Sequence, residues 1–360
     1  MKRIGMLTSG GDCQGLNAAL HGVAKALYEY YGEDNLQIYG ITDGYRGLIT
    51  GEYRLMSRED FSGILNLGGT ILGTSRQPFK LMRVIDEKDS VDKVAAMKAT
   101  YKKLKLDCLV ILGGNGTHKT ANLLREEGLN VVTLPKTIDN DVWGTDMTFG
   151  FQSAVDIAAN VLDCIHTTAT SHGRVFIVEL MGHKAGWLTL HAGIAGGADV
   201  ILIPEIPYTT ESIVKTLKKR NRMGKRFSIL AVAEGAISKE DAALSKKAYK
   251  AKLASSPYPS ISYKLATELE ALTGQEIRVT VPGHFQRGGS PCPYDRTLST
   301  RFGAAAAQLV IEGKYGNMVA LRNNEIVPVP LQEVAGKLKT VPTDSSIVRA
   351  ARQIGVCFGD

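Results

Sequence analysis

Residues 131–141 read Val-Val-Thr-Leu-Pro-Lys-Thr-Ile-Asp-Asn-Asp, and this is the most informative stretch of the chain. Its apolar beginning predicts a buried strand, and the polar residues after it predict the loop that leaves this strand. Open α/β sheets bind their ligands at such loops. Asp139 and Asp141 share a face if the loop is extended, because alternate residues of an extended chain do so. The stretch therefore predicts a ligand site with two carboxylates.

Two carboxylates in such a loop suit phosphoryl transfer. One can accept a proton from a hydroxyl group while the other holds a cation beside a phosphorylated donor. The alternative is structural, since Thr137, Asn140 and Asp141 could instead satisfy turn amides and cap the next helix. The motif alone favours the structural alternative, so the rest of the chain has to decide.

The composition is that of a soluble globular protein with two lobes. The chain has 360 residues, of which 44% are hydrophobic and 22% charged, and this length exceeds the size at which one core usually stops growing. No apolar stretch approaches the ~20 residues that cross a bilayer, and the N-terminus carries no signal-peptide pattern. The five cysteines are scattered without metal-ligand spacing, so we expect a cytoplasmic protein with no membrane partner.

The net charge of +7 comes from short groups of lysine and arginine residues. Aromatic residues make up only 7% of the chain, and no segment interleaves them with basic residues as a nucleic-acid groove would. We therefore expect no nucleic-acid partner. Solvated helix faces explain most of the charge, and phosphorylated small molecules explain the remainder.

Short β-branched or apolar runs alternate with helical patterns along the chain. This alternation predicts an α/β protein with two Rossmann-like lobes, each a mainly parallel sheet sandwiched by helices. The polar stretch 238–262 predicts a surface insertion that is helical in part. The expected strands cover residues 4–8, 37–42, 107–112, 130–134, 174–180, 199–203, 227–233, 277–281 and 317–321.

Two glycine-rich loops follow expected strands. Residues 113–117 read Gly-Gly-Asn-Gly-Thr, and residues 8–12 read Thr-Ser-Gly-Gly-Asp. Backbone amides of such loops can cradle phosphates, and glycine lets the backbone approach the ligand closely. Neither loop continues into a Walker A motif. Two such loops leaving neighbouring strands can hold one nucleotide from both sides.

Three arginines stand beside or among glycines, namely Arg76, Arg174 and Arg287. An arginine fits a phosphate group with two parallel hydrogen bonds. Taken alone, each arginine is better explained as a surface residue paired with a carboxylate than as a phosphate ligand. His183 and His284 are likewise compatible with purely structural roles. Only their combination with the glycine loops favours phosphate chemistry.

Taken together, these segments resemble the phosphofructokinase family, whose members phosphorylate the 1-hydroxyl of fructose 6-phosphate in glycolysis. The similarity runs in collinear order from Ile4 to about Gly316. Besides the loops already quoted, it covers Leu-Gly-Thr-Ser-Arg at 72–76, the turn at 179–182, Ile-Ala-Gly-Gly at 194–197, Pro-Glu at 204–205 and Gly-His-Phe-Gln-Arg-Gly-Gly-Ser-Pro at 283–291. So many motifs in one order leave little room for chance.

The resemblance implies a role for each motif. Asp139 is expected to be the base that accepts the proton of the sugar hydroxyl, which Thr137 and the backbone of Ile138 position. Asp141, with Asn115, is expected to hold Mg²⁺. The residues expected to bind the phosphoryl donor are Gly11, Arg76, Gln77, Gly113, Gly114, Asn115, Gly116 and Thr117; those expected to bind the sugar phosphate, besides Thr137, Ile138 and Asp139, are Arg174, Met181, Gly182, His183, Glu234, Arg278, His284 and Arg287.

The resemblance also implies an assembly and a division into lobes. In this family, arginines at the positions of Arg174 and Arg278 reach the substrate of a neighbouring subunit, so we expect a homo-oligomer, a dimer or a tetramer. Residues 1–150 are expected to form the donor lobe, to which the chain returns near 270–315. Residues 151–316 are expected to form the sugar-phosphate lobe, and residues 317–360 a C-terminal extension that packs on the lobes.

Two positions bear on the phosphoryl donor and disagree. Pyrophosphate-dependent relatives carry an aspartate where this chain has Gly116, and that carboxylate would collide with the α-phosphate of ATP. Gly116 therefore favours ATP. Lys136, in contrast, is typical of pyrophosphate users, although it also occurs in a mixed ATP-using branch of the family. Because an ammonium group can serve either donor, we give more weight to Gly116 and expect ATP, with pyrophosphate as the alternative.

Asn115 departs from the family pattern, in which most relatives carry an acidic metal ligand. An asparagine offers Mg²⁺ only a neutral carbonyl oxygen. We therefore expect a higher Mg²⁺ requirement rather than loss of activity. A catalytically weak, ligand-binding subunit remains a third hypothesis, against which the retention of Asp139, Asp141 and Arg76 counts. A kinase acting on NAD or lipid is disfavoured, because it would not account for residues 283–291.

Overall fold

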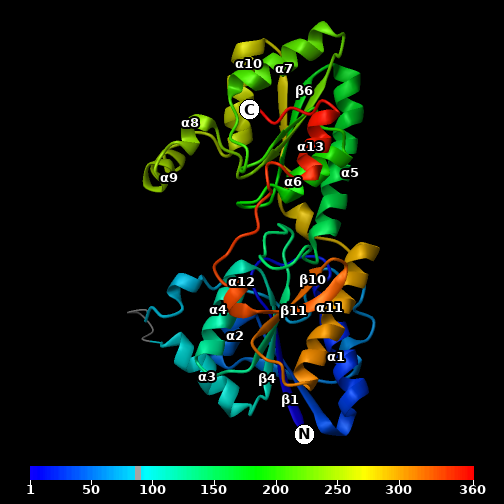
Figure 1. Cartoon of the computed structure of the whole chain (residues 1–360), viewed down its shortest axis with the longest axis vertical. Coiled ribbons are helices and arrows are strands. Elements are labelled where there is room, and N and C mark those ends of the chain that lie inside the picture. Colours follow the sequence, from blue (N-terminus) through cyan, green and yellow to red (C-terminus); the bar gives the residue numbers. More distant parts are fainter. Residues whose placement is uncertain (86–90) are drawn as a thin grey trace. The chain divides into compact units, whose positions relative to one another are not determined.

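The computed structural model describes residues 1–85 and 91–360 (Figure 1). It divides the chain into two compact units, each built from two stretches of sequence. The first unit consists of Met1–Ser153 and Arg287–Lys339, and the second of Ala154–Gln286 and Thr340–Asp360. Each unit has one mainly parallel sheet flanked by helices, which confirms the predicted fold class.

The sheet of the first unit has the strand order β11-β10-β5-β4-β1-β2-β3. Its inner strands are parallel, whereas the edge strands β3 and β11 run antiparallel to their neighbours. The parallel strands are those predicted from apolar runs. The bounds are β1 Lys2–Thr8, β2 Leu36–Ile41, β3 Tyr53–Met56, β4 Cys108–Gly113, β5 Val131–Pro135, β10 Asn317–Arg322 and β11 Glu325–Pro330.

The two antiparallel edge strands, β3 and β11, were not predicted. Three of the four residues of β3 are exposed, so it lacks a continuous apolar run. β11 contains Pro328 and Pro330, and proline within a sheet is confined to edges because it cannot donate a ladder hydrogen bond. Both strands therefore lack the sequence pattern of a buried strand.

Helices cover the two faces of this sheet. α1 and α11 lie side by side (Figure 1) and approach closely where glycines meet: a Cβ atom on Gly22 would lie 3.2 Å from Cα of Gly303. The helices are α1 Leu16–Tyr31, α2 Tyr45–Thr50, α3 Lys93–Lys103, α4 Asn115–Glu126, α11 Pro293–Ile311 and α12 Leu331–Val334, with short 3₁₀ turns at Glu33–Asn35, Glu59–Phe61 and Phe79–Leu81.

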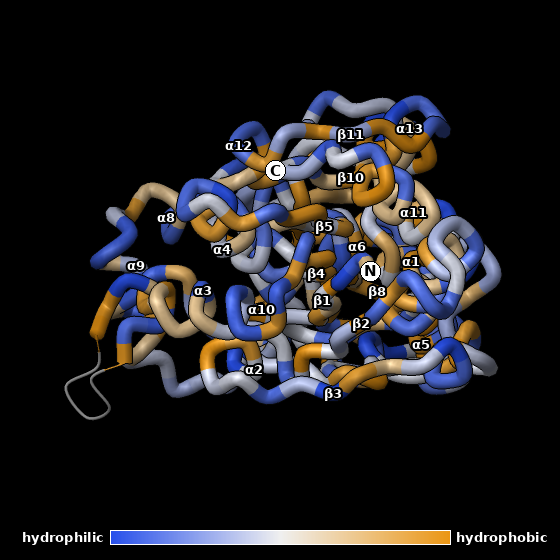
Figure 2. The backbone as a smooth tube through the Cα atoms, turned by 90° about the horizontal axis from the view of Figure 1, so that it is seen from below, coloured by the Kyte–Doolittle hydropathy of each residue, from blue (hydrophilic) through white to orange (hydrophobic). Residues whose placement is uncertain are grey.

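The core of the first unit lies around its central strands. Every residue of β4 and β5 is buried, as expected for parallel strands covered on both faces. The strands β1, β4 and β5 carry the hydrophobic colour in Figure 2. A rigid, buried sheet of this kind holds the loops at its carboxyl edge in fixed positions.

The sheet of the second unit has the order β7-β8-β6-β9 and is parallel throughout. Its strands are β6 Val175–Leu180, β7 Val200–Leu202, β8 Ser228–Ala233 and β9 Ile277–Thr280. All four were predicted. The accompanying helices are α5 Phe151–His172, α6 Trp187–Ala195, α7 Thr210–Arg222, α10 Ile261–Thr273 and α13 Ser346–Gln353, and a 3₁₀ turn covers Gly283–Arg287.

The predicted insertion at residues 238–262 is helical in part. It contains α8 Lys239–Ala242 and α9 Lys246–Ala254, which extend away from the sheet of the second unit (Figure 1). No residue of α9 is buried. The far end of the insertion is fixed by Glu179 of β6, whose carboxylate accepts hydrogen bonds from the Ser260 hydroxyl group at 2.6 Å and the Ser262 amide at 3.1 Å.

The C-terminal segment 317–360, expected as an extension, is divided between the two units. Its first part supplies β10 and β11 to the large sheet, whereas Thr340–Asp360 belongs to the second unit. Arg287, which lies in the range 270–315 where we expected the chain to return to the donor lobe, begins the second stretch of the first unit. The chain changes unit within the 3₁₀ turn Gly283–Arg287, where no loop composition marks a boundary.

Candidate active site

Three loops meet at the carboxyl edge of the large sheet, because β1, β4 and β5 are parallel neighbours. Their backbones are joined directly. The Ser9 amide donates to the carbonyl of Leu112 at 2.9 Å, and the Lys136 amide donates to the carbonyl of Gly113 at 2.9 Å. The buried ammonium group of Lys136 donates to the carbonyl of Gly11. The two glycine loops and the Asp139 loop thus form one continuous site.

Two guanidinium groups converge on Gly11. A Cβ atom at this position would lie 2.9 Å from Nη1 of Arg287 and 3.3 Å from Nη2 of Arg76. Arg287 is also fixed to this loop by a hydrogen bond from Nη1 to the carbonyl of Asp12 at 3.0 Å. Gln77 directly follows Arg76. The absence of a side chain at Gly11 therefore leaves space where an anion would meet both arginines and a backbone amide.

The loop that holds Arg76 is braced by hydroxyl groups. The Thr74 hydroxyl group donates to the carbonyl of Gly10 at 2.7 Å, and the Ser75 hydroxyl group donates to the carbonyl of Asp43 at 2.6 Å. The Gly10 amide donates back to the carbonyl of Ser75 at 3.1 Å. This network explains the sequence Gly-Thr-Ser-Arg: its polar residues place the arginine beside the first glycine loop.

The second glycine loop leads directly into α4. Gly113 packs so closely on Thr117 that a Cβ atom would lie 2.3 Å from the threonine side chain, whereas a Cβ atom on Gly116 would meet nothing within 4 Å. The first turn of a helix presents free amide groups and the positive end of its dipole. Gly114, Asn115 and Gly116 therefore lie where an oligophosphate would be stabilised.

Asp139 lies in a tight turn beside these loops. The Asp139 amide donates a hydrogen bond to the hydroxyl oxygen of Thr137 at 3.1 Å. The Oδ1 atom of Asp139 is buried and accepts no hydrogen bond within the described residues. Asn140, the next residue, has a φ of 49°, a left-handed conformation that asparagine tolerates better than most residues. The turn thus leaves Oδ1 of Asp139 buried without a hydrogen-bond donor, although the residue as a whole is only partly buried.

Asp141 is the second carboxylate of this turn and is buried, with 6% of its surface exposed. Burial, and next the charge of Asp139, raise its pKa to about 6. The Asn115 side chain lowers this pKa in part, and its Nδ2 atom donates to the Asp141 carbonyl at 3.1 Å. Asn115 thus contacts Asp141 as a hydrogen-bond donor.

In the second unit, residues expected to bind the sugar phosphate gather at the carboxyl edge of its sheet. Oε1 of Glu234, which follows β8, accepts the amides of Gly182 at 3.2 Å and His183 at 2.7 Å. This carboxylate thereby fixes the turn after β6, where His183 has a φ of 52°. Met181 begins the same turn. His284 follows β9, the other strand beside β6, and is exposed.

Arg174 and Arg278 lie at the opposite edge of this sheet. Both pair with Glu276: Nε of Arg174 lies 2.5 Å from Oε2, and Nη2 of Arg278 contacts Oε1. Arg174 directly precedes β6, whereas Met181 directly follows it. A strand of this length spans about 20 Å, so Arg174 and the Met181–His183 turn lie at opposite ends of β6.

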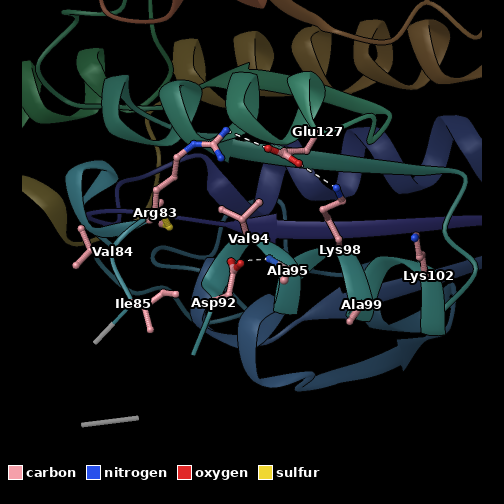
Figure 3. A pocket seen from close by; sticks show the side chains of 11 residues that line it. Arg83, Val84, Ile85, Asp92, Val94, Ala95, Lys98, Ala99, Lys102 and Glu127 are labelled. Carbon is pink, nitrogen blue, oxygen red and sulfur yellow. Dashed lines mark hydrogen bonds and ion pairs between the residues drawn. The ribbon is translucent and has the colours of Figure 1, made fainter. Parts of the chain in front are cut away.

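A cavity of about 580 Å³ lies elsewhere in the first unit, beside α3. Figure 3 shows Arg83 and Lys98 pointing toward Glu127, with which both form ion pairs, at 3.0 and 2.9 Å. Its lining contains none of the residues predicted for the site. Glu127 follows α4 at the end remote from Asn115, so this cavity lies away from the start of α4 and is separate from the predicted site.

The sequence match now decides the family. Residues 3–310 match the family described as Phosphofructokinase. The chain belongs to the phosphofructokinase family. It is 58% identical to the protein named ATP-dependent 6-phosphofructokinase of Spirochaeta thermophila, with 100% of this chain and 98% of that protein covered. It is 48% identical to ATP-dependent 6-phosphofructokinase 3 of Bacteroides thetaiotaomicron, with 99% and 100% covered.

Solved phosphofructokinase structures have the same fold. The structure of phosphofructokinase from Saccharomyces cerevisiae matches with a TM-score of 0.77 and 31% identity, over 93% of this chain but only 45% of the yeast chain. A pyrophosphate-dependent phosphofructokinase from Marinobacter aquaeolei matches with a TM-score of 0.79, over 100% of this chain and 93% of that one; its identity of 21% supports the fold alone. Within the described residues, no helix has the length and apolarity to cross a membrane.

The site also contains a residue that sequence reasoning missed. The ammonium group of Lys339 donates to Oδ1 of Asn140 at 2.9 Å, although 199 positions separate the two residues. Neither glycine spacing nor a charged motif singles this lysine out, and it lies beyond the residues that match the family.

Proposed function

We propose that this chain is an ATP-dependent 6-phosphofructokinase, which transfers the γ-phosphoryl group of ATP to the 1-hydroxyl of fructose 6-phosphate. The observation that carries the proposal is the 58% identity, over the full chain, to a protein named for this activity. The geometry supports it, because the two glycine loops, two arginines and the Asp139 turn meet at one edge of the large sheet.

In this proposal Asp139 is the general base. Its partly buried carboxylate, whose Oδ1 atom has no partner within the described residues, accepts the proton of the 1-hydroxyl as the bond to phosphorus forms. Thr137 fixes the Asp139 amide, and with the Ile138 backbone it orients the attacking hydroxyl group. As the new bond forms, the bond between the γ-phosphorus and the bridging oxygen of the donor breaks, so that ADP leaves and the proton stays on Asp139.

The donor phosphates bind to the glycine loops. Gly113–Thr117 would hold them at the start of α4, while Gly11, Arg76 and Arg287 neutralise the charge that spreads over the transferring phosphoryl group. Phosphoryl transfer needs little beyond in-line positioning and this neutralisation. Arg287 therefore acts on the donor side of the reaction in this proposal, in addition to the sugar-phosphate role that the family resemblance implies.

The carboxylates fit a magnesium ion. Asp141 is buried beside Asp139 and has a raised pKa. A bound cation would offset the repulsion between these two carboxylates. When bound, Mg²⁺ would neutralise charge on the donor phosphates. Asp141 would hold the ion, with the side-chain oxygen of Asn115 as a weaker ligand, and Asn115 would keep the Asp141 backbone in place.

ATP is favoured over pyrophosphate by the open space at Gly116, where a side chain would meet no atom within 4 Å. Nucleotide phosphates beyond the γ-phosphate can occupy that space. The pyrophosphate alternative rests on Lys136, whose ammonium group is already engaged by the Gly11 carbonyl. The relatives cited above with 58% and 48% identity are both named as ATP-dependent enzymes.

The separation of the arginines in the second unit supports a homo-oligomer. Arg174 and Arg278 pair with Glu276 at the amino edge of the sheet, and they would bind the 6-phosphate of a sugar held by the Met181–His183 turn of a neighbouring subunit. The donor would bind to the first unit and the sugar phosphate to the second, in a cytoplasmic dimer or tetramer.

The test is a parallel assay of the purified wild-type protein with fructose 6-phosphate and Mg²⁺. ATP and pyrophosphate are compared as donors at matched concentrations, and fructose 1,6-bisphosphate is quantified directly. We expect turnover with ATP and none above background with pyrophosphate. Turnover with pyrophosphate alone would support the alternative based on Lys136, and no turnover with either would favour a ligand-binding subunit.

A further inference from the structure

Lys339 braces the turn that carries the two carboxylates. Its ammonium group donates to Oδ1 of Asn140, to the carbonyl of Thr145 and to the carbonyl of Asp146, each at 2.9 Å. Its backbone amide donates to the carbonyl of Asp141 at 2.8 Å. An ammonium group has three hydrogen atoms to donate, enough to serve these three acceptors. Every acceptor lies within residues 140–146.

The turn depends on Asn140. This residue stands between Asp139 and Asp141 with a φ of 49°, and its Oδ1 atom also accepts the amide of Thr148 at 3.0 Å. The side chain of Asn140 therefore links the start of this loop to Thr148 near its end. Its orientation fixes the direction of the backbone from one carboxylate to the other, and Lys339 holds that orientation from outside the loop.

The segment that carries Lys339 is itself anchored. Leu338, the residue before Lys339, forms an antiparallel bridge with Val142 within the same unit. This bridge, together with the bond from the Lys339 amide to the Asp141 carbonyl, holds the backbone of Lys339 beside the turn.

We propose that Lys339 is a positioning residue for phosphoryl transfer, which aligns Asp139 and Asp141 by holding Asn140 and touches neither substrate. The proposal rests on the proposed function for its kinetic consequence, although the bracing of the turn can be measured without any activity. It extends the active site to a residue outside the range 3–310 that matches the family.

The first variant is Lys339→Met, which keeps the length of the side chain and removes all three donors. We expect kcat with ATP and fructose 6-phosphate to fall about 100-fold, because misplacing a reacting group by about 1 Å costs this much. The KM values of both substrates stay within about threefold, since no binding residue changes. The matched control is Lys337→Met: this exposed lysine contacts the Trp143 ring, 5.8 Å from its centroid, and bonds none of the acceptors.

The second readout is hydrogen–deuterium exchange in peptides covering residues 137–149. In Lys339→Met we expect the amides of this loop, including that of Thr148, to exchange at least tenfold faster than in the wild type and in Lys337→Met. If exchange in Lys339→Met equals that of the wild type, the proposal is overturned whatever the kinetics show. If exchange is faster but kcat is unchanged, Lys339 braces the turn without positioning the reacting groups, and the positioning role is overturned. An inactive wild type would refute the proposed function, while exchange would still decide whether Lys339 braces the turn.

A thermal melt establishes that each variant folds. Should Lys339→Met fail to fold, Asn140→Gly removes the main acceptor while accepting the positive φ. The proposal then requires the same loss of kcat with unchanged KM values, and wild-type kcat in Asn140→Gly would overturn it.

Discussion

The ammonium group of Lys136 donates a hydrogen bond to the backbone carbonyl of Gly11, within the loop that faces Arg76 and Arg287. Lys136 is buried, with 3% of its surface exposed. Burial lowers its pKa, an effect to which Arg287 adds and which Asp139 opposes. The lysine therefore connects the loop after β5 to the loop after β1, a role that serves any phosphoryl donor.

This relationship predicts different results for two substitutions. Lys136→Met removes the bond to Gly11, so turnover with ATP should fall at least about tenfold without any gain with pyrophosphate. Gly116→Asp leaves the fold intact, because its side chain enters open space, yet it should raise KM for ATP at least about tenfold by repelling the nucleotide phosphates. Steady-state kinetics with both donors check this contrast. A gain of pyrophosphate turnover in Lys136→Met would show that the lysine sets the donor.

Asn115→Asp should change the metal requirement. The new carboxylate would be a stronger ligand for Mg²⁺, so the Mg²⁺ concentration for half-maximal rate should fall. Without metal the same variant should melt at a lower temperature than the wild type, because it adds a negative charge beside Asp141 and loses the donor to the Asp141 carbonyl. Rate measurements over a Mg²⁺ titration and melts in a chelator test the two parts. An unchanged Mg²⁺ dependence would remove Asn115 from the metal shell.

Asp141 should make the metal-free protein less stable as pH rises. Burial and the charge of Asp139 raise the pKa of Asp141 from 3.8 to about 6 in the folded state. At a pH between these two values, the folded state keeps a proton that the unfolded state has released. The free energy of unfolding should therefore fall from about pH 4 to about pH 6. The shift corresponds to about 3 kcal/mol at 1.36 kcal/mol per pKa unit. Asp141→Asn should remove this loss, at the expense of activity.

Denaturant melts of both proteins in a chelator, at pH 4 and pH 7, test this expectation. Asp141→Asn should be the more stable protein at pH 7 and about equal to the wild type at pH 4. Equal stability at both pH values would show that the buried carboxylate is not strained in the metal-free state.

Hybrid oligomers test the contribution of Arg278 across subunits. Asp139→Asn and Arg278→Ala should each be nearly inactive alone. If Arg278 serves the neighbouring subunit, a mixture refolded together should regain activity, because some sites combine an intact Asp139 from one chain with an intact Arg278 from another. Mixing without refolding is the control. No recovery in hybrids of demonstrated mixed composition would place both residues in the same chain's site.

Much of the fold and of the site could be predicted from the sequence, for identifiable reasons. The short apolar run 108–112 is followed by glycines, a pattern that favours a buried strand, and the structure buries it fully; glycines in the loop after it allow close approach of a ligand. β3 and β11 were missed because exposed or proline-containing edge strands lack that pattern. The resemblance implies a sugar-phosphate role for Arg287, and its bond to the carbonyl of Asp12 adds a contact with the first glycine loop that no local motif indicates.

Lys339 could not be predicted at all. Its contacts with the turn 140–146 span between 193 and 199 positions of sequence, and a single lysine near the C-terminus is indistinguishable from a solvated one. Only the three-dimensional structure shows that it has three acceptors within one loop. The composition of a site can therefore be inferred from local motifs, whereas the residues that hold it in shape come from anywhere in the chain.

The most direct test of the central claim is the rate of fructose 1,6-bisphosphate formation from ATP and fructose 6-phosphate, compared between the wild type and Asp139→Asn. The substitution keeps the shape of the side chain and removes its ability to accept the hydroxyl proton. We predict measurable turnover in the wild type and a loss of kcat of about 100-fold or more in the variant, with KM for fructose 6-phosphate within about threefold. A variant that keeps more than about a tenth of the wild-type kcat would contradict the role of Asp139 as the base.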